Sequence, residues 1–157
     1  GVDMLVDACR KGGFTLLHVG NLVDYPFPLE KNFTHIHSVN QTKLVNYYAK
    51  AKVLALPSRQ DGFGLVLAQA MACGLPLVYS HDTGGPDLRN LIEHKEYLFE
   101  MENFTLDALI DSLGKAIAAS EKLMPNRNYL TEYDKQRITW NACGNRYNDF
   151  LTKTFGK

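Results

Sequence analysis

Short apolar runs and amphipathic segments alternate along the chain. The apolar runs have the length and the bounding turn residues of buried strands, and they cover 14–19, 34–38, 53–56, 77–80 and 97–99. Apolar positions with helical spacing predict helices over 2–11, 40–50, 65–73, 86–93, 105–120, 129–137 and 139–152. Alternating strands and helices are typical of a doubly wound parallel sheet with helices on both faces. We therefore expect one α/β domain spanning residues 1–157.

Composition excludes several classes of protein. The 17 basic and 17 acidic residues balance to a net charge of zero, so nothing indicates a nucleic-acid partner. The three cysteines, Cys9, Cys73 and Cys143, are scattered and form no CxxC metal pair, as expected of reduced thiols in the cytoplasm. No apolar run reaches the length of a transmembrane helix.

The most informative stretch is the glycine loop between the run 53–56 and the helix 65–73. Gly62 and Gly64 let the backbone turn sharply and approach a ligand closely, and Gly74 ends the helix. A helix that starts at such a loop points free N–H groups and its positive dipole end at whatever lies above the strand. The stretch therefore predicts a site for phosphate or another anion.

Two polar residues sharpen this interpretation. Asp61, Leu65 and Gln69 are spaced four apart, so they share one face if the helix begins near Asp61. Gln69 lies among apolar residues, and a buried amide without partners costs about 1–3 kcal/mol. Either the protein or a ligand hydroxyl must satisfy it. The simpler alternatives are a helix N-cap for Asp61 and a core amide for Gln69.

Ligands of a doubly wound sheet bind outside the carboxyl ends of its strands. Four candidate loops fall at this edge, namely 20–21, 37–39, 58–64 and 81–85. Ser58, His81 and Asp82 could suggest a hydrolase triad, but no Gly-x-Ser-x-Gly elbow is present, and we reject that reading. For Arg59 we slightly prefer a solvated side chain over a phosphate ligand.

The segment from Pro57 to Pro76 resembles the signature of the retaining family-four glycosyltransferases of the GT-B fold. That signature reads Pro-Ser, two variable residues, Glu-Gly-Phe-Gly, and a helix with Glu-Ala-Met-Ala-Cys-Gly-x-Pro. Asp61 and Gln69 stand here in place of its two glutamates. Further matching segments are Leu16–Gly20, Phe33–His37, His81–Asp87 and Ile138–Trp140.

The resemblance implies a Rossmann-like, nucleotide-sugar-binding C-terminal domain and a role for each motif. It implies that Asp61 is the catalytic acid beside the donor sugar, and that Gln69 contacts the ribose more weakly than Glu would, by about 1–2 kcal/mol. The other implied donor-binding residues are Ser38, Val39, Gly62, Phe63, Gly64, Leu65, His81, Asp82, Thr83, Gly84 and Gly85. The nucleotide-diphosphate sugar is a substrate, and no cofactor or metal is expected.

The resemblance also implies a larger protein. We expect this chain to be a fragment that lacks the first strand of its domain and an N-terminal domain that binds a saccharide or lipid-linked acceptor. The whole would be a cytoplasmic bacterial enzyme of polysaccharide or glycolipid assembly, peripheral at the inner membrane through the missing domain. We expect the gap left by the strand to be filled, for example by a strand-swapped homodimer.

Two alternatives remain open. One is a degenerate glycosyltransferase-like domain with a scaffold or regulatory role, suggested by the replacement of both signature glutamates. The other is a different GT-B enzyme, such as a nucleotide-sugar epimerase or a glycogen-type glucosyltransferase.

Overall fold

The computed structural model describes residues 1–23, 25–124 and 126–155. Its elements follow one another in the order α1 (Val2–Gly12), β1 (Leu16–Val19), β2 (Phe33–Ile36), α2 (Gln41–Tyr48), β3 (Leu54–Leu56), α3 (Leu65–Ala72), β4 (Leu77–Tyr79), α4 (Gly85–Leu91), a 3-10 turn (Lys95–Tyr97), β5 (Leu98–Glu100), α5 (Leu106–Leu123), α6 (Glu132–Arg137) and α7 (Trp140–Phe155). The predicted alternation of strands and helices is confirmed.

The strands form two parallel sheets. β1 pairs with β2, and β4 lies between β3 and β5 in the second sheet. Within the described residues, neither β1 nor β2 pairs with β3, β4 or β5. The predicted parallel α/β fold is therefore confirmed, with its strands divided between two ladders.

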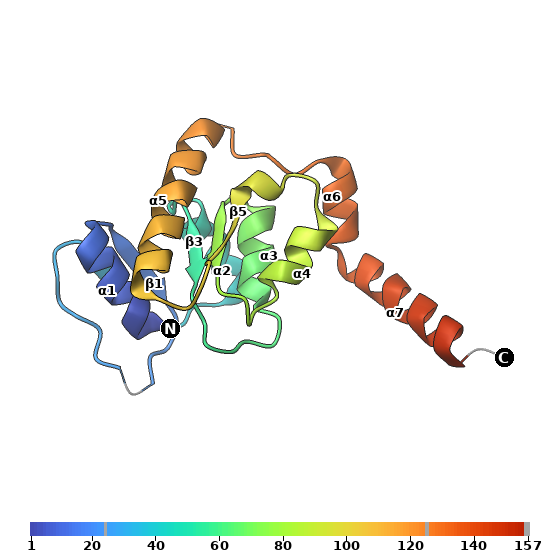
Figure 1. Cartoon of the computed structure of the whole chain (residues 1–157), viewed down its shortest axis with the longest axis horizontal. Coiled ribbons are helices and arrows are strands. Elements are labelled where there is room, and N and C mark those ends of the chain that lie inside the picture. Colours follow the sequence, from blue (N-terminus) through green and yellow to red (C-terminus); the bar gives the residue numbers. More distant parts are fainter. Residues whose placement is uncertain (24, 125, 156–157) are drawn as a thin grey trace.

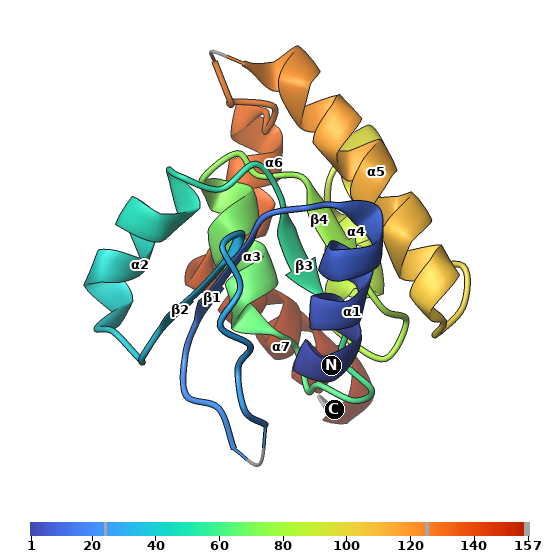
Figure 2. The same cartoon turned by 90° about the vertical axis from the view of Figure 1, so that its left-hand side faces the viewer.

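Apolar layers cover both faces of the three-stranded sheet. Because successive side chains of a strand point to opposite faces, Leu77 and Tyr79 join one cluster and Val78 joins the other. The first cluster brings in α2, α3 and α4, and the second brings in α1, α5, β1 and β2. Figure 2 shows α2 and α3 on one side and α1 and α5 on the other, as predicted for a doubly wound fold.

The C-terminal helices differ from the prediction at their start. The helix expected from Tyr129 begins only at Glu132, because Tyr129 and Leu130 are buried ahead of it and Thr131 caps it. The Thr131 hydroxyl accepts the Asp134 N–H, and the Asp134 carboxylate accepts the Thr131 N–H, which makes a capping box. The sequence Thr-x-x-Asp was the available signal for this boundary.

The last helix, α7, projects away from the body of the molecule (Figure 1). None of its residues is buried, and Trp140, Tyr147 and Phe155 expose most of their surface. Among the described residues, no helix has both the length and the apolar character needed to cross a bilayer.

Candidate functional site

Two loops lie side by side at the carboxyl ends of β3 and β4. The N–H of Asp61 donates to the carbonyl of Asp82 at 3.0 Å, and the N–H of Gly84 donates to the carbonyl of Phe63 at 3.1 Å. Two backbone bonds between loops about twenty residues apart fix their relative position. The loops 58–64 and 81–85, which the sequence analysis placed at one edge, therefore form one unit.

Hydrogen bonds from side chains at the end of β4 and in the second loop strengthen this unit. The Ser80 hydroxyl, at the end of β4, donates to the carbonyl of Ser58 at 2.5 Å. The buried Thr83 donates through Oγ1 to the carbonyl of Ser80 at 2.8 Å and accepts the N–H of Gly85 at 3.2 Å. Thr83 and the N–H groups of Gly84 and Gly85 are thus already bonded inside the protein. His81 and Asp82 are the exposed residues of this loop.

The glycine pair is required by close packing. A Cβ on Gly84 would lie 2.1 Å from the carbonyl oxygen of Phe63, and a Cβ on Gly85 would lie 2.1 Å from the Tyr79 ring. Gly64 has a φ of +65° and precedes α3 directly, a backbone conformation that favours glycine. No atom lies within 4 Å of the position that a Cβ on Gly62 would take, so there is room beside this residue for a ligand.

Helix α3 begins at Leu65 and not near Asp61. The condition on which Asp61 would share a helical face with Leu65 and Gln69 is therefore not met, and Asp61 lies in the loop. Its carboxylate comes within 3.7 Å of the position that a Cβ on Gly64 would take. It therefore lies near the start of α3, where Gly64 supplies no side-chain cap to the first N–H groups. The negative charge of Asp61 therefore lies near the positive end of the α3 dipole.

His81 has a fixed partner. Its Nδ1 lies 2.8 Å from Oε1 of Glu100, at the end of β5. The hydrogen bond and the charge of Glu100 raise the pKa of His81 above its usual value. The imidazole is well exposed at the same edge as the two loops, so it can donate a proton or a hydrogen bond to a bound anion.

Gln69 is half-buried in the second turn of α3, and its Oε1 accepts a hydrogen bond of 3.1 Å from the Tyr48 hydroxyl. The protein thus supplies one partner for this amide, as one of the two readings of the sequence required. Tyr48 was not among the residues singled out from the sequence. It shares the apolar side of the expected helix 40–50 with Tyr47, and spacing alone could not tell which hydroxyl meets α3.

Two further predicted residues come from outside the paired loops, and Arg59, within the first loop, has its partner outside them. Ser38 and Val39 follow β2, which belongs to the other sheet. The Arg59 side chain is well exposed, and its guanidinium pairs with both Asp3 carboxylate oxygens at 3.1 and 2.7 Å. It also lies over the Phe104 ring. Arg59 therefore ties the loop after β3 to α1.

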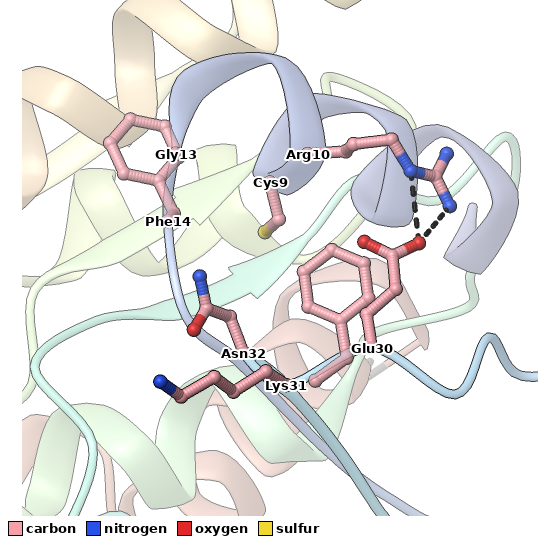
Figure 3. A pocket seen from close by; sticks show the side chains of 8 residues that line it. Cys9, Arg10, Gly13, Phe14, Glu30, Lys31 and Asn32 are labelled. Atoms are coloured by element: carbon pink, nitrogen blue, oxygen red, sulfur yellow. Dashed lines mark hydrogen bonds and ion pairs between the residues drawn. The ribbon is translucent and has the colours of Figure 1, made fainter.

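A pocket of about 130 Å³ lies at the opposite edge of the molecule, beside the amino ends of β1 and β2 (Figure 3). Arg10 spans it to the Glu30 carboxylate, with bonds of 3.0 and 2.6 Å. Burial raises the pKa of the Cys9 thiol on its wall to about 11, which leaves it unreactive near neutral pH. Within the described residues, no group of three or more His, Cys, Asp or Glu side chains is arranged to hold a metal.

Comparison with known proteins identifies the family of this chain. The family model "Glycosyl transferases group 1" matches residues 26–137. An uncharacterised glycosyltransferase of Haemophilus influenzae is 34% identical over 92 residues, which is 59% of this chain and 24% of that protein.

Two solved structures share the fold. Sucrose-phosphate synthase from Thermosynechococcus elongatus superposes with a TM-score of 0.69 at 22% identity, covering 98% of this chain and 43% of that one. WaaG, a glycosyltransferase involved in lipopolysaccharide biosynthesis, gives 0.61 at 20% identity, with 99% and 44% covered. The chain therefore covers between 24% and 44% of the length of these three proteins.

Proposed function

The chain belongs to the glycosyl transferases group 1 family, and on that premise we propose that it binds a nucleotide-diphosphate sugar for transfer of the sugar, with retention, to an acceptor. The observation that carries the proposal is the pair of loops 58–64 and 81–85, bonded to each other above the strand ends and beside the start of α3. Such an edge is where a parallel α/β sheet binds its ligand.

Each part of the site has a role in this proposal. The diphosphate lies at the start of α3, where open space at Gly62 lets it approach the N–H groups. Asp61 lies beside the donor sugar, and Gln69 contacts the ribose. His81 and Asp82 reach sugar hydroxyls from the neighbouring loop. In this proposal the positive end of the α3 dipole, and not a metal, offsets the negative charge of the diphosphate.

The whole protein's activity is also part of the proposal, because the chain covers 24% of the relative from Haemophilus influenzae. We place the acceptor, a saccharide or lipid-linked glycan, on a further domain. The proposed setting is the cytoplasmic side of a bacterial inner membrane, in polysaccharide or glycolipid assembly. Self-association through open strand edges is proposed for the isolated chain.

Calorimetric titration tests the donor site. UDP, GDP and ADP are titrated separately into this chain and into the longest natural polypeptide that contains it. We expect one of them to bind, and Gln69→Glu to tighten that binding about 5- to 30-fold, because a carboxylate makes stronger bonds to hydroxyls than an amide does. Failure of all three nucleotides in both forms would overturn the proposal.

Two observations favour the second candidate, a degenerate domain with a scaffold role. The Gln69 oxygen is already bonded to Tyr48, and Asp61 is one methylene shorter than the glutamate of the resembling signature. The titration decides between the two, because a scaffold would bind no nucleotide even after Gln69→Glu. Binding with measurable transfer to an acceptor would favour the enzyme.

A further inference from the structure

We propose that Tyr48 is a positioning residue that sets which end of the Gln69 amide faces the nucleotide. The inference rests on the proposed function, and it concerns a residue outside the glycine loops and outside α3. The juxtaposition that carries it is the bond of 3.1 Å from the Tyr48 hydroxyl to Oε1 of Gln69.

Tyr48 is held firmly enough to position a neighbour. It is the last residue of α2, and its side chain is 8% exposed within the apolar cluster that also contains Leu67 and Met71 of α3. Burial, together with the neighbouring Cys73, raises the pKa of the Tyr48 hydroxyl. The phenol therefore remains protonated and remains a donor across the physiological pH range.

This bond fixes the chemistry that Gln69 offers. An amide has one acceptor oxygen and two N–H donors. With Oε1 bonded to Tyr48, the donors are left to face the ligand. Gln69 lies four residues after Leu65, about 6 Å along the helix axis. This distance suits a sugar ring joined to a phosphate at the helix start.

The consequence is that Gln69 recognises the ribose as a hydrogen-bond donor. The Gln69 N–H groups donate to a ribose hydroxyl oxygen, whereas a glutamate would accept from the hydroxyl proton. The bond to Tyr48 favours the amide orientation with oxygen toward the phenol, so the orientation that presents oxygen to the ribose is disfavoured. Removal of the hydroxyl leaves a mixture of two amide orientations, and the ribose bond weakens in one of them.

The experiment measures discrimination between ribose and deoxyribose. The nucleoside diphosphate that binds the unaltered protein most tightly is titrated together with its 2′-deoxy and 3′-deoxy forms into the unaltered protein and into Tyr48→Phe. We expect the unaltered protein to lose about five-fold in affinity for one deoxy form, on the usual strength of one hydrogen bond. The ratio of the affinity for the ribose form to the affinity for that deoxy form should fall close to one in Tyr48→Phe.

Tyr47→Phe is the matched control, because it removes a phenol hydroxyl from the neighbouring residue. The Tyr47 ring makes a cation–π contact with the Lys50 ammonium. Tyr47→Phe should keep the ratio of the unaltered protein. Thermal unfolding of both variants separates positioning from stability, because a merely structural role would lower the melting temperature and leave the ratio unchanged.

The outcomes distinguish this inference from the function on which it rests. Nucleotide binding with an unchanged ratio in Tyr48→Phe would overturn the positioning role and leave the donor site standing. Absence of binding by any nucleotide would overturn both. A ratio lost in Tyr48→Phe and kept in Tyr47→Phe supports the inference.

Discussion

Glycines at the site serve different purposes, and the contacts around each one decide which. Gly84 and Gly85 are fixed by neighbours only 2.1 Å from where a Cβ would lie. Gly62 has open space, so packing does not require a glycine there. The sequence predicted a glycine-rich loop at 81–85, but not its packing partners. Phe63 and Tyr79 come close to it only once two loops and a strand end have assembled.

Replacing Gly85 with alanine tests this packing. Because the new methyl would overlap the buried Tyr79 ring, we expect Gly85→Ala to lower the free energy of unfolding by about 1–3 kcal/mol. Gly114→Ala is the control, in an exposed position within α5 where nothing lies within 4 Å. It should raise stability by about 0.5–1 kcal/mol. Chemical denaturation measures both, and equal effects would contradict the packing argument.

At the scale of elements, a buried carboxylate joins the C-terminal helices to the sheet domain. Asp134, in the first turn of α6, accepts the N–H of Glu93 at 2.8 Å and also accepts the N–H and hydroxyl of Thr131. Burial opposes its ionisation, yet these bonds prevail and lower the pKa of Asp134. Glu93 follows α4, so one side chain holds the end of α4 against the start of α6.

Asp134→Asn removes the charge from this junction. We expect a loss of about 1–3 kcal/mol at neutral pH, since a buried charged acceptor of three bonds is weakened. A carboxyl whose pKa is lowered on folding stabilises above its unfolded pKa, and that contribution disappears as pH falls through the folded pKa. The gap in melting temperature between the variant and the unaltered protein should therefore close in acid.

Asp111→Asn provides the comparison for this charge removal. Asp111 forms an exposed i,i+4 pair with Lys115 on α5, and such pairs contribute well under 1 kcal/mol. A pH-independent effect of Asp134→Asn, or an equal effect at Asp111, would contradict the role of Asp134.

Sequence patterns predicted elements better than junctions. Helix α3 begins at Leu65 as expected, because the glycine loop before it and the apolar run within it agree. The boundary at Glu132 was missed, because Tyr129 and Leu130 are apolar and look helical in sequence. Tyr129 instead bonds through its hydroxyl to the carbonyl of Leu75, a long-range contact that no local pattern encodes.

At the scale of the whole molecule, β1 and β3 each have one edge that pairs with no other strand in the part of the chain that the structure describes. The Leu54 N–H donates to Pro76, toward β4, and alternate residues of a parallel strand face opposite edges. Ala55 therefore turns its backbone N–H and carbonyl away from β4. On β1, the bonds of Leu16 and Gly20 run toward β2, so Leu17 and Val19 turn theirs away from it. Unpaired edges of this kind recruit further strands.

This geometry predicts that the isolated chain self-associates through β1 or β3. Sedimentation velocity over a range of protein concentrations should show a shift from monomer toward dimer. Leu17→Lys should weaken the shift, because a charge on an edge strand opposes pairing with another edge. Val23→Lys makes the same change in a well-exposed loop position and should leave the shift intact.

The two lysine variants also locate the contact. Equal weakening by both would mean that association depends on net charge and not on the edge of β1. A monomer at every concentration would contradict the proposal of open, recruiting edges. Ala55→Pro removes the outward N–H of β3, and proline cannot donate to a new ladder. If the dimer survives Leu17→Lys but is lost in Ala55→Pro, the contact lies at β3.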